Sequence, residues 1–169
     1  RFDRNTLILT SKPSEKKLKK LGFNNIEVLK NGIQKNIGDL TIKAHDAGFP
    51  YNYLWTFSFE IIQGDKALYF ESHVDKPSRI KQNNLKADCA ILTTEEVKIL
   101  GLLPLSNSSE TTLEILKELE CKNIMIQGSD PAETKGLISY FLKIGKENLG
   151  IFKSNNINVY KDPGSELVI

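Results

Sequence analysis

The pattern of hydrophobic and polar positions changes near the middle of the chain. Before Pro77, apolar residues alternate with polar ones, as in "GDLTIKAHDA" and "LWTFSFEII", and such alternation is typical of half-buried β-strands. After Pro77, apolar runs such as "DCAILTT" take turns with helical repeats such as "SSETTLEILKELE". The pattern therefore predicts an α/β fold with a large, partly antiparallel sheet.

Turn and cap signals place the individual elements. We expect a first helix in "KPSEKKLKKLGF", with Ser14 as its N-cap and Gly22 at its end. Further helices are predicted at 78–85, with Ser78 as the cap, and at 108–120 and 130–155. Strands are predicted at 6–10, 26–29, 40–44, 54–62, 67–72, 88–94, 122–127, 157–160 and 166–169.

An aromatic loop, "HDAGFPYNYLW", joins two of the predicted strands. Loops of this kind often carry function, and an equally good interpretation is a hydrophobic plug on the sheet edge. Alternation predicts that the following strand turns its aromatic residues to one face. The candidate binding residues of the loop are Phe49, Tyr51, Tyr53 and Trp55.

Composition indicates a single globular domain over residues 1–169. Hydrophobic residues make up 40% of the chain and charged residues 26%, and the net charge of +2 gives no reason to expect a nucleic-acid partner. No stretch is apolar enough to span a membrane, so we expect no membrane partner and a cytoplasmic location, or the plastid stroma in a plant or alga. Cys89 and Cys121 lie far apart in apolar contexts, which favours two buried free thiols over a disulfide.

The start of the chain carries a separate expectation. "RFDRNTLILT" has no initiator Met and no signal-peptide pattern, and it enters a strand almost at once. We therefore expect that an upstream portion precedes this sequence.

Polar side chains gather where the run "ALYFESHVDKPS" ends. Glu71, His73 and Asp75 follow an apolar strand, and His45 ends another predicted strand. Imidazole and carboxylate groups are the usual ligands of zinc, so these side chains form a candidate metal site. The alternative is that they only cap a strand end or hydrogen-bond to loop backbone.

A second candidate lies at "QGSDPAETKGL". Its glycine, its serine and a following helix N-terminus offer backbone N–H groups to a phosphate, but Asp130 places a carboxylate where the anion would sit. A helix capped by Asp130 is the competing interpretation. The chain contains no Walker loop, dinucleotide glycine pattern, His-Glu-x-x-His or Gly-x-Ser-x-Gly, so no catalytic residue is identified.

The order of these motifs resembles the second half of the metallo-β-lactamase superfamily. There a strand hairpin ending in "GDT" is followed by a buried strand of the type "DLAILPV". The stretch Tyr69 to His73 is similar to the "YYEPH" of a cyanobacterial and plastid branch. Gly128 to Leu137 is similar to that branch's "NGD…KGL", and Pro163 to Ile169 resembles its "PGE.L.I" ending.

The resemblance implies an αββα sandwich, partial in this chain, with a metal site at its edge. Family members usually hydrolyse an ester, amide or phosphodiester with a metal-activated water. The family's His-x-His-x-Asp-His signature is absent, its bridging Asp aligns with His73, and its last His falls near Gln127 or Gly128. The implied metal ligands are therefore His73 and Glu71, with His45 a weaker candidate and Asp75 an orienting residue.

Three interpretations of function stay open. One is a metal-dependent hydrolase with a degenerate or incomplete site, which needs zinc, iron or manganese and is inactive as this chain alone. Another is a non-catalytic module of the same fold that binds a small molecule or a protein through the loop 45–55. The last is a fragment with a large exposed apolar sheet face.

Overall fold

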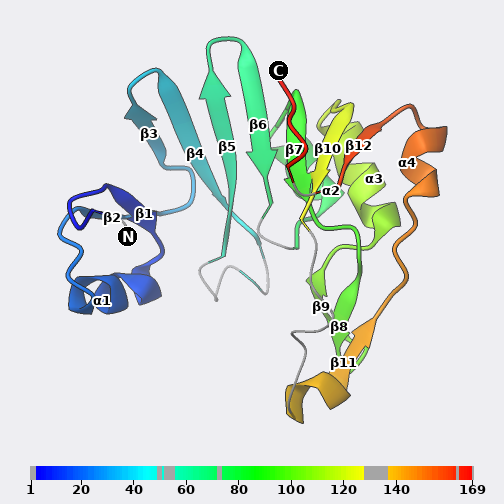
Figure 1. Cartoon of the computed structure of the whole chain (residues 1–169), viewed down its shortest axis with the longest axis horizontal. Helices are drawn as coiled ribbons and strands as arrows, with labels where there is room; N and C mark the ends of the chain where they lie inside the picture. Colours follow the sequence, from blue (N-terminus) through cyan, green and yellow to red (C-terminus); the bar gives the residue numbers. More distant parts are fainter. Residues whose placement is uncertain are drawn as a thin grey trace.

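A mixed sheet forms the centre of the computed structural model, which describes residues 3–48, 51, 56–71, 74–127, 137–162 and 164–168, without the side chains of 137 and 138. The sheet has seven strands in the order β12-β10-β7-β6-β5-β4-β3 (Figure 1). Their bounds are β3 Gln34–Ile37, β4 Leu40–Asp46, β5 Phe57–Gln63, β6 Lys66–Phe70, β7 Cys89–Leu92, β10 Asn123–Ile126 and β12 Asn158–Tyr160.

The sheet is antiparallel on one side of β6 and parallel on the other. Strands β3 to β6 pair antiparallel with their neighbours in sequence, and Gly64 has the positive φ that the tight β5–β6 turn requires. β6, β7, β10 and β12 pair in parallel. Parallel neighbours need crossover connections, and three of these contain helices, namely α2 (Pro77–Gln82), α3 (Ser109–Glu118) and α4 (Gly150–Ser154). The predicted change of pattern along the chain is thus confirmed, except that residues 142–144, inside the helix predicted at 130–155, form a strand.

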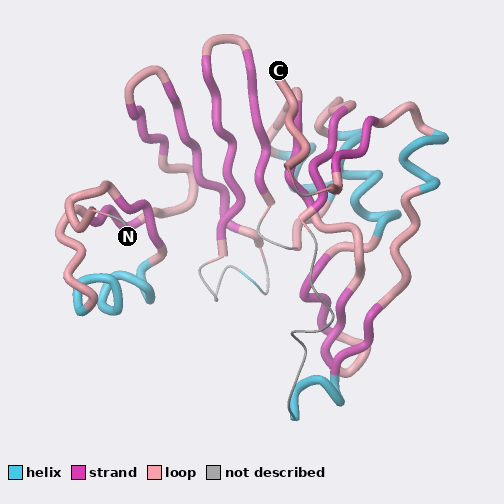
Figure 2. The backbone as a smooth tube through the Cα atoms, in the orientation of Figure 1, coloured by secondary structure: helices cyan, strands magenta, loops and turns pink. Residues whose placement is uncertain are grey.

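Two small sheets flank the large one (Figure 2). At the N-terminal end, β1 (Ile8–Thr10) pairs in parallel with β2 (Ile26–Val28), and α1 (Lys12–Lys20) connects them. Near the other end, β8 (Val97–Ile99) lies between β9 (Leu103–Ser106) and β11 (Leu142–Ile144). This three-stranded sheet projects away from the body, and the short helix η3 (Leu137–Phe141) lies at its far end (Figure 1).

The main hydrophobic core lies between the parallel half of the sheet and the helices. Tyr69, Ala90, Leu92 and Ile124 point to the same face because they are paired across strands or lie two residues apart. They pack with side chains from α2, α3 and α4, including Ile80, Ile115, Leu116 and Phe152, which are almost fully buried.

The two faces of β5 are used differently from the prediction. Ser58 and Glu60 are buried, whereas Phe57, Phe59 and Ile61 are only half-buried. The register explains this, because Glu60 lies opposite Tyr69 of the helix-covered face. The alternation was therefore predicted correctly, but the polar residues occupy the more buried face.

Several predicted boundaries are corrected by the structure. The N-caps of α1 and α2 are Ser11 and Lys76 rather than Ser14 and Ser78, since Pro13 and Pro77 fit the first turn of a helix. Ser108 does cap α3 and accepts a hydrogen bond from the Thr111 backbone N–H. Residues 164–168 form no strand.

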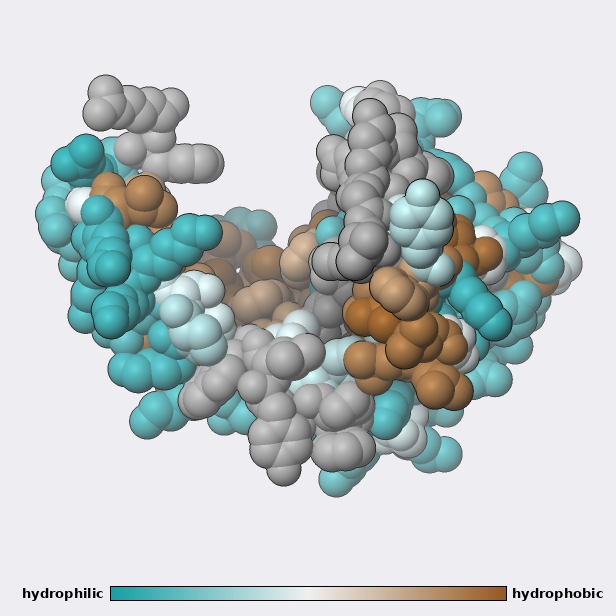
Figure 3. All heavy atoms as spheres, turned by 90° about the horizontal axis from the view of Figure 1, so that it is seen from below, coloured by the Kyte–Doolittle hydropathy of each residue, from teal (hydrophilic) through white to brown (hydrophobic). Residues whose placement is uncertain are grey.

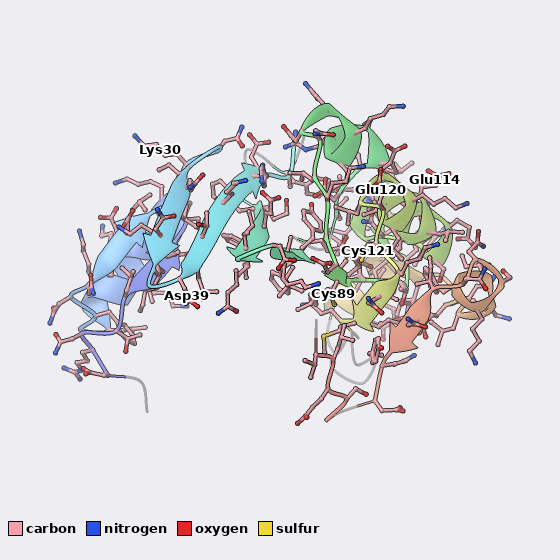
Figure 4. The ribbon with its side chains drawn as sticks, turned by 90° about the horizontal axis from the view of Figure 1, so that it is seen from above. Lys30, Asp39, Cys89, Glu114, Glu120 and Cys121 are labelled. Carbon is pink, nitrogen blue, oxygen red and sulfur yellow. The ribbon has the colours of Figure 1, made fainter. Side chains whose placement is uncertain are left out.

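The two thiols are buried and free, as predicted, and lie on neighbouring parts of the core (Figure 4). Burial raises the pKa of the Cys121 thiol to about 11, so it stays protonated near neutral pH.

In the part of the chain that the structure describes, no helix combines the length and apolar character needed to cross a membrane.

Stability should depend far more on the core than on exposed leucines. We expect Leu92→Ala to lower the free energy of unfolding by about 3 kcal/mol, because Leu92 is fully buried and its truncation leaves a cavity. Leu21→Ala is the matched control, since the Leu21 side chain is 57% exposed, and its cost should stay within about 0.5 kcal/mol. Urea unfolding followed by circular dichroism measures both, and equal losses would contradict the assignment of this core.

Candidate functional site

The carboxyl ends of five strands meet at one edge of the large sheet. β4 and β6 both run antiparallel to β5, and β6, β7, β10 and β12 are mutually parallel. The chain therefore leaves β4, β6, β7, β10 and β12 on the same side. In α/β sheets this is the edge where ligands most often bind, so the polar residues that follow these strands form the candidate site.

Glu71 lies directly after β6 and is buried to 1% exposure. One carboxylate oxygen accepts hydrogen bonds from the backbone N–H and the hydroxyl of Thr93, and the other accepts from Asn107 Nδ2 at 3.0 Å. The Asn107 backbone N–H in turn donates to Thr93 Oγ1 at 3.1 Å. Burial raises the pKa of Glu71 to about 7, although these donors favour the ionised form. Glu71 thus joins the ends of β6, β7 and β9.

Asp75, which precedes α2, is the second buried carboxylate of the edge. Its oxygens accept from the Tyr69 hydroxyl and from the Lys76 backbone N–H, the latter at 2.8 Å. Arg79 Nε lies 3.8 Å from Asp75 Oδ1. Desolvation raises the pKa of Asp75. Burial, together with the neighbouring Asp75 carboxylate, raises the pKa of Tyr69 well above its ordinary value.

Arg79 connects α2 to the end of β4. Its Nη2 donates to the Asp46 carboxylate at 2.8 Å and also to the Asp46 carbonyl. The guanidinium lies against Gly48, where an added Cβ would come within 2.8 Å of Arg79 Nη1, and Gly48 has a φ of +73°. The predicted aromatic loop therefore contains, near its start, a backbone position that favours glycine.

His45 lies on β4, and its Nε2 is buried without a hydrogen bond among the described residues. The nearest acidic oxygen is Glu60 Oε2 at 3.9 Å, which is too far for a hydrogen bond. The space beside His45, Tyr69 and Asp75 leaves no room for a water molecule. His45 is thus a packed, poorly solvated imidazole.

Some of the predicted site residues have a described position, and others lie outside the described ranges. Glu71, Asp75 and His45 share the same edge, and the Tyr51 hydroxyl donates to the Pro104 carbonyl on β9. Gln127 follows β10, where its backbone N–H donates to Leu92 and its buried side-chain oxygen has no partner in the described ranges. Outside the described residues lie Phe49, Tyr53, Trp55, His73 and Asp130.

The described residues by themselves do not form a metal site. Both oxygens of Glu71 and of Asp75 are engaged by donors from the protein. Within the described ranges, no three His, Cys, Asp or Glu side chains come together as a ligand set. A metal at this edge needs donors from the segments that follow the strands.

Sequence reasoning missed the partners of the two carboxylates. Thr93 and Asn107 belong to "ILTT" and "LSNS", which carry no motif. They are identified only by their hydrogen bonds to Glu71, from which they are 22 and 36 residues away in the sequence. Arg79 offered a weak signal, since it follows Asp75 by four residues at the start of a helix.

Comparison with solved structures identifies the fold. YhfI of Bacillus subtilis, a metallo-β-lactamase fold protein, superposes with a TM-score of 0.64 at 12% identity, over 96% of this chain and 64% of that one. A possible metal-dependent hydrolase from Veillonella parvula gives a TM-score of 0.67 at 12% identity, over 98% and 67%. The chain has a metallo-β-lactamase-like fold.

The diiron β-hydroxylase CmlA from Streptomyces venezuelae shares the same core, with a TM-score of 0.60 at 12% identity over 85% of this chain. The chain spans about a third of that protein's length (34%) and about two thirds of the other two. No protein-family model and no curated protein matches the sequence.

The buried carboxylate should make stability depend on pH. The pKa of Glu71 is raised from 4.5 to about 7 on folding, so the folded state binds this proton more tightly than the unfolded state. This group contributes a stabilisation of the folded state on the order of 3 kcal/mol. The contribution is fully present below about pH 4.5 and is lost as the pH rises through about 7. We expect Glu71→Gln to lack this decline in urea unfolding measured between about pH 5 and pH 8.

Glu114→Gln is the control for this experiment, because Glu114 is exposed on α3 (Figure 4). It should keep the wild-type decline. An unchanged pH dependence in Glu71→Gln would show that another group causes it.

The Tyr69 hydroxyl should also contribute to stability. In Tyr69→Phe, the buried Asp75 carboxylate loses a donor, so we expect a loss of about 2 kcal/mol in the free energy of unfolding. Tyr140→Phe removes the same atom from a side chain that is 86% exposed and should have no measurable effect. If the two variants unfold alike, the Tyr69–Asp75 contact is not stabilising.

Proposed function

We propose that this protein is a metal-dependent hydrolase of the metallo-β-lactamase type, acting on an ester, amide or phosphodiester. The observation that carries the proposal is the anchoring of both ends of the segment that contains His73. Glu71 precedes His73 by two residues and Asp75 follows it by two, and each is buried and hydrogen-bonded. Such anchoring is what a catalytic or ligating side chain needs on a short loop.

In this proposal, Glu71 and Asp75 position the site and do not bind the metal. Their oxygens are occupied by Thr93, Asn107, Tyr69 and the Lys76 backbone. Hydrogen-bonded carboxylates of this kind commonly orient the residues around a metal. His73, and further donors outside the described residues, are the proposed ligands.

The identity of the metal and the substrate class rest on likeness alone. Among the structural neighbours, one is named a possible metal-dependent hydrolase and another a diiron hydroxylase. A further neighbour, PqqB of Methylobacterium extorquens, is named as Zn²⁺-bound. Iron and zinc are therefore the first metals to measure, and manganese is the third that the family resemblance implies. Because fold does not fix chemistry, the hydrolase proposal needs its own test.

A second candidate is a binding module on the same fold. It is favoured by the engagement of both buried carboxylates, which removes them from any ligand set. It is also favoured by Tyr51, which is tied to β9 through the Pro104 carbonyl and so fixes one point of the aromatic loop 45–55. Such a module would bind a small molecule or a protein at the same edge.

Metal content separates the two candidates. We expect the purified full-length protein to hold about one metal ion per chain or more, measured by elemental mass spectrometry, and His73→Ala to lose it. Loss of metal should be accompanied by loss of hydrolysis of p-nitrophenyl acetate or bis(p-nitrophenyl) phosphate.

His45→Ala is the comparison variant, because it removes the other histidine of the chain and the weaker ligand candidate, which lies on β4 and not on the segment between Glu71 and Asp75. It should keep the metal. Absence of zinc, iron and manganese from the wild-type protein would rule out the hydrolase and leave the binding module.

A further inference from the structure

The three-stranded sheet ends in an apolar tip that faces away from the body. Leu100 and Leu102, in the β8–β9 turn, are 60% and 84% exposed. Tyr140 and Phe141, at the end of η3, are 86% and 49% exposed, and the Phe141 carbonyl accepts from the Leu100 backbone N–H at 2.7 Å. These four side chains, which we call the apolar tip, come from two segments that the chain brings together.

The tip continues into an apolar face of the same sheet. Leu103 lies opposite Ile99, which lies opposite Leu142, so these side chains share one face. Leu103, Leu105 and Ile144 are each about two-fifths exposed, at 39%, 38% and 44%. A group of neighbouring exposed apolar side chains is typical of a contact with another protein or with a membrane.

The turn at the tip has an unfavourable sequence. Leu100 and Gly101 have φ of +52° and +70°, and the Leu102 backbone N–H donates to the Ile99 carbonyl, which defines a type I′ turn. The first position of this turn favours Asn, Asp or Gly, and a leucine there is strained. The structure thus places a strained and exposed leucine in the turn of the apolar tip.

The lysines of this sheet are partly offset by acidic residues. Lys98 and Lys143 lie opposite each other on β8 and β11, whereas Lys146 lies at the same end of the sheet as Glu96, away from the tip. Lys98 pairs with Glu96 at 2.8 Å, whereas no carboxylate among the described residues pairs with Lys143 or Lys146. The Lys143 ammonium lies at the tip, since a Cβ on Gly101 would be 3.1 Å from its Nζ.

The same side of the molecule also carries the lysine-rich helix α1. Seen from below, a hydrophobic patch and the hydrophilic N-terminal unit that contains α1 are both visible, on opposite sides of a hollow (Figure 3). α1 exposes Lys12, Lys16, Lys17, Lys19 and Lys20. Among the described residues, Glu15 is the one acidic partner of these lysines, through Lys12 at 2.8 Å and Lys19 at 2.7 Å.

We propose that this face docks onto the surface of an anionic lipid bilayer, with the apolar tip entering the headgroup region and the lysines contacting the lipid phosphates. Leucine and phenylalanine gain by leaving water, tyrosine is suited to the interface, and unpaired lysines attract anionic lipid. This contact needs no membrane-spanning segment, so it differs from the expectation of no membrane partner that the hydropathy suggested. A symmetric contact with a second copy through the tip is disfavoured because it would bring two Lys143 ammonium groups together.

Co-sedimentation with vesicles tests the proposal on the full chain. We expect binding to phosphatidylcholine vesicles that contain phosphatidylglycerol, weak binding to phosphatidylcholine alone, and a fall in binding as sodium chloride is added. Lys143→Gln should weaken binding to the anionic vesicles only.

Leu100→Asn with Leu102→Asn is the decisive variant. Asn is preferred at the first turn position, so the variant should fold at least as stably while its vesicle affinity falls about tenfold or more. Val168→Asn, at a side chain that is 95% exposed elsewhere, is the control and should bind like the wild type.

Two results would overturn the proposal. One is that the wild-type protein does not bind the anionic vesicles, or that the Leu100→Asn, Leu102→Asn variant binds them as tightly as the wild type. The other is a concentration-dependent dimer in analytical ultracentrifugation that the variant abolishes without any vesicle binding, which would assign the tip to a second copy of the chain.

Discussion

The burial of a carboxylate at the end of β6 constrains the whole edge of the sheet. An ionisable group at 1% exposure is tolerated only when its oxygens have donors, and those donors must come from other segments. Thr93 and Asn107 meet this requirement. Their contacts fix where β7 and β9 end relative to β6, and therefore how the three-stranded sheet is attached to the body.

The edge is built as two linked polar clusters. One centres on Glu71, and the other runs from Tyr69 through Asp75 and Arg79 to Asp46. Only three residues separate Glu71 from Asp75 in the sequence. The neighbours in fold share about 12% identity with this chain, so the backbone arrangement persists while the side chains differ. The backbone of this edge is therefore shared with those proteins, whereas the hydrogen-bonded side chains described here are those of this chain.

The sequence predicted the fold better than the site. Apolar alternation and cap residues act locally, which is why β4, β5, β6, β7 and α3 could be found from the pattern alone. The short strands β8, β9 and β11 were missed, because "VKILGLLPLS" mixes turn and strand signals and its partner β11 lies about 40 residues away.

The site residues were only partly accessible to sequence reasoning. Glu71 and Asp75 were found because polar groups ended an apolar run. Their hydrogen-bonded state could not be found, since it depends on Thr93 and Asn107 arriving through tertiary contact. Burial of Ser58 and Glu60 was likewise hidden, because the register with Tyr69 and not the local pattern decides which face is covered.

The division of the sheet at β6 has a consequence for how the chain folds. β3 to β6 form a meander closed by short turns and the loop before β5, so their pairing costs little loop entropy. β7, β10 and β12 can pair only after crossovers that include helices, and such non-local pairing is slow. β6 belongs to both halves, and so we infer that the meander assembles first and provides the template on which the parallel strands are added.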